Sequence, residues 1–183
     1  MTKEQLKKTG TGVVIKQDIS ENRVKSIYLG IGSNLGNKKN NIEIAKFQLS
    51  QNEVTILKTS SYYETPSWPN PNHPKFLNIV IEVDSNLNPQ KLLNLCKKIE
   101  INLGRKEMPK NSPRECDIDI LDYNKKHTHE TPILPHPKLH LRNFVLLPLF
   151  EINKDWKHPI LKHHIKELIL SLSNKDIRSI KQI

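Results

Sequence analysis

Apolar residues recur with two different spacings along the chain from residue 27 onward. Residues 27–31 form a short apolar run before a glycine-containing polar turn, which predicts a β-strand that ends at Gly32. Residues 37–51 follow with apolar side chains at roughly helical intervals, which predicts a helix. Its apolar positions are Ile42, Ala45, Phe47 and Leu49. Residues 54–65 are extended and rich in β-branched side chains, and residues 76–83 predict a plainer strand.

The strongest helical pattern lies at residues 88–105. Asn88 can cap its N-terminus, Pro89 suits its first turn, and Gly104 can end it. A single apolar stripe runs along this helix and predicts the face that packs on the core. The stripe consists of Leu92, Leu95, Cys96, Ile99 and Leu103.

A strand over residues 117–123 completes the order strand, helix, strand, strand, helix, strand. This order predicts an α+β fold with a ferredoxin-like βαββαβ core and an antiparallel sheet. Residues 166–173 predict a further amphipathic helix, so additional C-terminal helices are expected. The prolines of residues 66–75 predict a long irregular loop. We expect a single domain over residues 26–183, preceded by a polar N-terminal extension at residues 1–25.

Composition and charge narrow the classes of partner. A length of 183 residues suits one domain, and a net charge of +10 favours anionic partners such as nucleotides or nucleic acids. Two cysteines without a Cys-x-x-Cys motif disfavour a disulfide scaffold and a cysteine-based zinc site. No apolar run approaches the roughly 20 residues of a membrane span, and no signal-peptide core follows the N-terminus. We expect a cytoplasmic monomer with no membrane partner.

The segment SPRECDIDILDY, residues 112–123, places two carboxylates on one face of its predicted strand. Asp117 and Asp119 are two positions apart, so their side chains point the same way at a spacing of roughly 6.6 Å. One interpretation is a solvated outer face, and the other is a cradle for divalent cations, since Mg²⁺ is typically held by one or two carboxylates plus substrate phosphates. Arg105 and Arg114 could neutralise charge on a transferred group, or they could belong to an ordinary surface ion-pair cluster.

Other candidate residues each have a structural and a functional interpretation. Gly30, Gly32 and Gly36 fit neither of the glycine-rich nucleotide motifs, so a structural turn is favoured. Glu100 could be a solvated helix charge, and His136 lacks the helical partner that a zinc pair requires. For four further residues, a core or loop-anchoring role and a ligand contact both stay open. They are Trp68, Phe76, Asn78 and Phe144.

Several segments together resemble one enzyme family. The segments are GSNLG, SSYYETP, FLNIVIEV, IEINLGR, PRECDIDILDY and LPHPKLHLRNFVLLPLFEI. Their order and approximate spacing are similar to those of the 6-hydroxymethyl-7,8-dihydropterin pyrophosphokinase family of folate biosynthesis, over about residues 26–160. The combination of R-x-x-D-x-D with P-H-P…R-x-F is the most specific part of this resemblance.

The resemblance implies a reaction and a set of site residues. The β,γ-pyrophosphoryl group of ATP would pass to the hydroxymethyl oxygen of the pterin, and AMP would leave. Asp117 and Asp119 match two aspartates that bind a pair of Mg²⁺ ions, while Arg105 and Arg114 match catalytic arginines that act on the phosphates. The ATP-binding positions are matched by Glu100, Arg105, Arg114, His136 and Arg142. The pterin-binding positions are matched by Thr65, Pro66, Trp68, Phe76, Asn78 and Phe144.

Two other classes of function stay open. A basic nucleic-acid-binding module with a ferredoxin-like sheet is compatible with the charge, although the predicted strands carry no aromatic stacking pair of the RNA-recognition kind. A nucleotide-binding relative that has lost activity could keep these motifs and differ in its loops. The resemblance favours the pyrophosphokinase, with ATP and the pterin as small-molecule partners and no nucleic acid.

Overall fold

The computed structural model describes residues 26–67, 70–106, 109 and 111–183, so the predicted extension at residues 1–25 lies outside the described residues. Within them, six strands form one antiparallel sheet with helices on both sides. The strands are β1 (Ile27–Ser33), β2 (Val54–Thr59), β3 (Tyr63–Thr65), β4 (Phe76–Ser85), β5 (Asp117–Tyr123) and β6 (Lys181–Gln182). The helices are α1 (Lys38–Ser50), α2 (Pro89–Asn102), the 3₁₀ helix η2 (Leu139–Leu141), α3 (Asn143–Ile152), α4 (Ile165–Leu170) and α5 (Asn174–Ser179). None of the helices in this part of the chain is long and apolar enough to cross a bilayer.

The sheet confirms the predicted ferredoxin-like order of elements. Its strands lie in the order β5-β1-β4-β3-β6, and β2 pairs with a second stretch of β4. The predicted extended segment 54–65 is therefore two strands, each of which pairs with β4. Strand β1 runs beyond its predicted end to Ser33. The turn predicted at Gly32 was wrong, because Gly32 pairs within the sheet on both sides.

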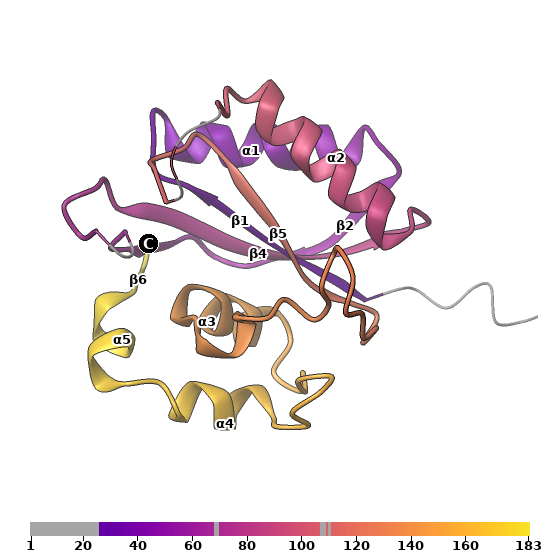
Figure 1. The fold of residues 1–183 in the computed structure, drawn as a ribbon. Helices are drawn as coiled ribbons and strands as arrows, with labels where there is room; N and C mark the ends of the chain where they lie inside the picture. Colours follow the sequence, from indigo (N-terminus) through magenta and orange to yellow (C-terminus); the bar gives the residue numbers. More distant parts are fainter. Residues whose placement is uncertain (1–25, 68–69, 107–108, 110) are drawn as a thin grey trace, which may run out of the picture.

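The sheet lies between two helical layers, as Figure 1 shows. Helices α1 and α2 cover one face, where Ile27, Leu29 and Ile31 of β1 belong to the larger hydrophobic core. Helix α3 covers the other face, where Tyr28 and Leu121 belong to a second core, and α4 packs on the outer side of α3. Strand β1 is buried on both faces, so its sequence is an apolar run instead of an alternating pattern.

The two helices of the first layer follow their predicted patterns with one exception. The side chain of Asn88 accepts a hydrogen bond from a backbone N–H of the first turn of α2, and Pro89 is the first residue of this helix. Gly104 follows α2 with φ of +106°, a left-handed conformation that glycine adopts without steric cost. In α1, Phe47 is one of the four apolar residues at helical intervals, but it lies off the buried face and is 64% exposed. The other three apolar residues, Ile42, Ala45 and Leu49, are buried.

The second layer contains more helix than the sequence analysis predicted. The predicted helix at residues 166–173 corresponds to α4, but α3 was not predicted. Its residues are apolar on nearly every side, and Pro148 lies inside it, so neither amphipathic spacing nor composition indicated a helix. After α3 in the chain, Trp156 Nε1 donates a hydrogen bond to Asp122 Oδ2 of β5 (2.9 Å), and burial raises the pKa of Asp122.

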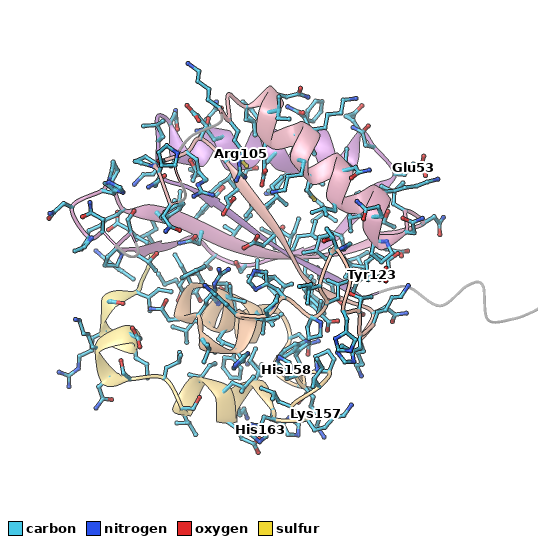
Figure 2. The ribbon with its side chains drawn as sticks, in the orientation of Figure 1. Glu53, Arg105, Tyr123, Lys157, His158 and His163 are labelled. Carbon is cyan, nitrogen blue, oxygen red and sulfur yellow. The ribbon has the colours of Figure 1, made fainter. Side chains whose placement is uncertain are left out.

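His158 makes the stability of this layer depend on pH. It lies in the loop before α4, on the far side of the sheet from Arg105 (Figure 2), and is 4% exposed. Its Nδ1 atom accepts hydrogen bonds from the backbone N–H groups of Ile160 and Leu161. Burial, reinforced by two neighbouring imidazoles, lowers the pKa of His158 from 6.5 to about 4. Between these pH values the unfolded chain binds a proton that the folded chain does not.

We expect the melting temperature to fall as the pH falls from 6.5 to about 4, because protonation of His158 favours the unfolded state. In the variant His158→Asn, which can still accept a hydrogen bond but does not titrate, the melting temperature should fall less over the same range. Thermal denaturation followed by circular dichroism measures both curves, with His129→Asn at an exposed histidine as control. Parallel curves for wild type and His158→Asn would contradict the assignment.

Candidate active site

Asp117 and Asp119 lie on the edge strand β5, each in an ion pair with arginine. Arg105 Nη1 and Arg114 Nη1 both lie 3.0 Å from Asp117 Oδ1. Arg142 Nη1 lies 3.0 Å from Asp119 Oδ2. The side chains of the two aspartates are 30% and 36% exposed, so a ligand from solvent can reach them. Three guanidinium groups thus offset the repulsion between two carboxylates on one face, and the structure brings these five predicted residues together.

Glu100, on α2, connects this helix to β5, the strand that carries Asp117 and Asp119. Its side chain is fully buried, and Oε1 accepts a hydrogen bond from the backbone N–H of Ile118 (2.7 Å). Oε2 is hydrogen-bonded to Arg105 Nη1 and lies 3.0 Å from Lys97 Nζ. Burial lowers the pKa of Arg105, but Glu100 and Asp117 raise it more, so the pKa is raised overall. Glu100 therefore holds the guanidinium group of Arg105 beside Asp117.

His136 and Arg142 reach Asp119 from the segment before α3. The backbone N–H of His136 donates to the carbonyl oxygen of Leu121 in β5 (2.8 Å), which holds this segment against the strand. His136 Nε2 lies 3.8 Å from Asp119 Oδ2, and its Nδ1 accepts a hydrogen bond from the backbone N–H of Lys138 (3.1 Å). Burial lowers the pKa of His136; Asp119 opposes this change and Arg142 adds to it, so the pKa is lowered overall. The imidazole is accordingly neutral at neutral pH.

The register of β1 determines how far the aspartates lie from Asn78. Gly32 pairs with Asp117 of β5 on one side and with Asn78 of β4 on the other. Gly30 pairs with Asp119 in the same way. Neighbouring strands lie about 4.8 Å apart, so the backbones at Asp117 and Asn78 are roughly 10 Å apart. Bare glycine backbone therefore separates the carboxylates from the amide.

Close packing beside Gly32 requires a glycine at this position. A Cβ atom there would lie 2.9 Å from Asn78 Oδ1 and 3.4 Å from Phe76 Cδ1, too close without a shift of those side chains. Asn78 Nδ2 donates to Thr65 Oγ1 of β3 (3.0 Å), and both residues are buried. This hydrogen bond fixes the orientation of the amide and places Oδ1 beside Gly32. Gly30 and Gly32 were predicted to belong to a turn, but both are strand residues.

Phe144, in the first turn of α3, lies beside Arg142. Its ring is partly buried against the second core, and the guanidinium carbon of Arg142 lies 5.4 Å from the ring centroid. Since Arg142 also pairs with Asp119, the aromatic ring adjoins the carboxylate cluster. Of the predicted loop residues, Pro66 is exposed, and Trp68 lies outside the described residues.

Asn34 is a residue of the site that the sequence analysis did not single out. It is 2% exposed, and its Nδ2 atom donates to Ser67 Oγ and to the carbonyl oxygen of Pro74, both at 3.1 Å. Its Oδ1 atom accepts from the backbone N–H of Arg114 (2.8 Å), and its own N–H donates to the carbonyl oxygen of Arg114 (3.1 Å). Asn34 thus connects the proline-rich loop to the arginine segment. The GSNLG motif that contains it was the available signal.

A sequence model of the 7,8-dihydro-6-hydroxymethylpterin-pyrophosphokinase (HPPK) family matches residues 28–154. The chain belongs to this family. The 2-amino-4-hydroxy-6-hydroxymethyldihydropteridine pyrophosphokinase of Aquifex aeolicus (strain VF5) is 42% identical over 144 residues, 78% of this chain and 89% of the relative. The protein of the same name from Bacillus subtilis (strain 168) is 40% identical over 127 residues, 68% of this chain and 76% of the relative. The predicted family resemblance is confirmed.

Solved structures of HPPK-DHPS proteins have the same fold. One HPPK-DHPS in complex with substrates matches with a TM-score of 0.67 at 15% identity, covering 87% of this chain and 46% of that chain. Wild-type HPPK-DHPS of Plasmodium falciparum matches with a TM-score of 0.63 at 18% identity, covering 90% of this chain and 45% of that chain. The present chain thus spans about half the length of these solved chains.

Replacing Asn34 should make the segment around Arg114 open locally more often than the whole protein unfolds. In Asn34→Ala the N–H of Arg114 loses its acceptor, and Ser67 and Pro74 lose a shared donor, which should cost about 1–3 kcal/mol of unfolding free energy. Hydrogen exchange at the Arg114 amide should accelerate more than exchange at Asn124, whose N–H donates to Ser26. Equal acceleration at both amides would mean that Asn34 acts only through global stability.

Proposed function

We propose that this protein transfers the pyrophosphoryl group of ATP to the hydroxymethyl oxygen of 6-hydroxymethyl-7,8-dihydropterin, releasing AMP and the pterin diphosphate in folate biosynthesis. Family membership supports the activity. One observation supports the placement of the two substrates: the aspartate–arginine cluster and the Asn78 amide lie on either side of Gly32 in one register. The nucleotide would bind at the cluster and the pterin at the amide, with the hydroxymethyl oxygen directed over the glycine backbone towards the phosphates.

Asp117 and Asp119 are the residues that would hold Mg²⁺. Two partly exposed carboxylates suit a cation that takes one or two protein ligands and completes its coordination with water and phosphate oxygens. Among the described residues, no group of three or more histidine, cysteine or acidic side chains could hold a metal ion. We infer two ions, which when bound would neutralise charge on the β- and γ-phosphates and orient them for in-line displacement.

Arg105 and Arg114 would act on the transferred phosphates. Both guanidinium groups converge on a single oxygen of Asp117, and each retains further N–H donors for phosphate oxygens. In the reaction the hydroxymethyl oxygen forms a bond to the β-phosphorus, the bond from that phosphorus to the α,β-bridging oxygen breaks, and the hydroxyl proton is released. Fixed positive charge stabilises the negative charge that develops on the phosphate oxygens.

The other nucleotide-binding positions divide into two kinds of residue. His136 and Arg142 lie against Asp119 and are partly exposed, so they are placed to contact the nucleotide. Glu100 is fully buried, so we infer that it acts through Arg105 rather than by touching ATP. An uncompensated carboxylate would be costly at this depth, and its contacts with Arg105, Lys97 and the Ile118 N–H offset that cost.

The pterin would stack between Phe76 and Phe144 and form hydrogen bonds with the Asn78 amide. Phe76 lies two positions before Asn78 on β4, on the same face, and Phe144 faces this side of the sheet from α3. A flat heterocycle favours stacking against aromatic rings together with a few fixed polar contacts. Thr65 fixes the Asn78 amide, and we propose that Pro66 and Trp68 contribute to pterin binding.

The experiment that tests this function identifies the products. The purified protein is incubated with ATP, Mg²⁺ and 6-hydroxymethyl-7,8-dihydropterin, and the nucleotides are separated by chromatography. We expect AMP and the pterin diphosphate in equal amounts. Formation of ADP would contradict pyrophosphoryl transfer. An unchanged nucleotide pool would indicate an inactive relative, and salt-dependent binding to random DNA would then favour a nucleic-acid-binding module.

The variant Asp117→Asn tests the metal assignment. Replacing the carboxylate by an amide should weaken Mg²⁺ binding and lower kcat/KM at least about 100-fold, a loss of roughly 2.7 kcal/mol of transition-state stabilisation. Raising the Mg²⁺ concentration should recover part of the activity. Asp155→Asn, at an exposed aspartate of the C-terminal layer, serves as the matched control and should leave kcat/KM unchanged. Full activity of Asp117→Asn with an unchanged Mg²⁺ dependence would refute the assignment.

A further inference from the structure

The C-terminal segment of residues 173–183 returns from α4 to the sheet. In Figure 1 it leaves α4, forms α5 and ends at β6 beside the sheet. The family match ends at residue 154, so this segment lies outside the part of the chain that defines the family. We call residues 173–183 the C-terminal clasp, because they are attached to the rest of the protein at two separate places.

The first attachment is a strand pairing with β3. Tyr63 pairs with Gln182 and Glu64 with Lys181, and the N–H of Ile183 donates to the carbonyl oxygen of Tyr62 (2.9 Å). The next residue of β3 is Thr65, whose hydroxyl accepts the hydrogen bond from Asn78. The clasp therefore forms the outer neighbour of the strand that orients the Asn78 amide.

The second attachment is made by Asn143, the first residue of α3. Its Nδ2 atom donates to the carbonyl oxygen of Asp176 (2.6 Å) and to Ser179 Oγ (3.1 Å), both in α5. Its Oδ1 atom accepts from the N–H of Phe144 (2.7 Å). The side chain of Asn143 thus connects the clasp to Phe144.

The clasp is held at these two places more than by packing. None of the residues of α5 is buried. A cavity of about 500 Å³ lies between the clasp and α3, lined by residues that include Tyr63, Phe150, Ile177 and Gln182. A segment with few buried apolar contacts opens locally at low free-energy cost, so individual hydrogen bonds determine how often it is attached.

We propose that the C-terminal clasp is a positioning element that holds the two walls of the pterin pocket at their working separation. One wall is β3, whose Thr65 orients the Asn78 amide of β4, and the other is the start of α3 with Phe144. This inference rests on the proposed function, since it assigns the clasp to the pterin half of that site. Asn143 acts through Phe144 and the clasp, and is therefore a positioning residue.

The proposal predicts a reciprocal coupling between pterin binding and attachment of the clasp. If attachment improves pterin affinity, pterin must favour attachment by the same factor. The Ile183 amide reports on this equilibrium, because its N–H is bonded only when the clasp pairs with β3. Exchange of this amide should slow when the pterin is added, whereas MgATP alone should leave it unchanged, since the nucleotide residues contact β5 rather than β3.

Two variants remove one attachment each. Asn143→Ala removes the connection between α5 and α3, and Ile183→Pro removes the N–H that donates to Tyr62. Each should raise the KM for the pterin about 3- to 10-fold, the factor that one net hydrogen bond supplies, and leave the KM for MgATP within about twofold. The control Lys175→Ala changes an exposed residue of α5 and should alter neither KM value.

The outcomes separate this inference from the proposed function. An active wild type with the pterin-selective rise in both variants supports the clasp. If the wild type is active and the variants lose only melting temperature, or raise both KM values equally, the clasp is merely structural and the inference is overturned. If the wild type releases no AMP, the proposed function fails and the clasp inference fails with it. Unchanged exchange at Ile183 on adding pterin to an active wild type also overturns it.

Discussion

Strand β1 pairs with β5 on one side and with β4 on the other, and every part of the candidate site depends on this double pairing. Gly32 is the shared position, opposite Asp117 and opposite Asn78. A slip of one residue would turn the aspartates into the first core and the apolar residues of β5 towards the site. The register is well determined because Ile27, Leu29 and Ile31 must stay in the core under α1 and α2. Because Ile27, Leu29 and Ile31 face the first core, the register that buries them also sets Asp117 and Asn78 opposite Gly32 on the other face.

Electrostatics then determines what this face can bind. Two aspartates and three arginines form a nearly balanced cluster that is open to solvent, within a chain whose net charge is +10. The overall positive charge attracts an anionic nucleotide, while the carboxylates provide the ligands that a hard cation prefers. Glu100 stabilises this arrangement from the buried side, because it pairs with Arg105 and bonds the backbone of β5. Removing it would leave Arg105 without one of its two acidic partners.

Hydrogen bonds between distant parts of the chain position the loops and the helix that surround this sheet. Asn34 connects the proline-rich loop to Arg114, although the two are far apart in sequence. The clasp connects β3 to α3 in the same manner, through backbone pairing at one end and the side chain of Asn143 at the other. Each connection depends on a few hydrogen bonds, which are individually modest and can respond to ligand binding. The sheet supplies the geometry, and these hydrogen bonds attach the loops and the helix that surround the site.

Local patterns in the sequence determined the order of the core elements, the capped helix α2 and the pairing of two carboxylates with nearby arginines. Periodicity, caps and motif spacing act over a few residues, so they can be read without the fold. The exposed position of Phe47, the helix α3 around Pro148 and the strand position of Gly32 were decided by the tertiary structure. So were the burial of Glu100, the contacts of Asn34 and the attachment of the clasp. All of these depend on which distant surfaces meet, and burial and cross-strand register are properties of the packed chain that no short window of sequence contains.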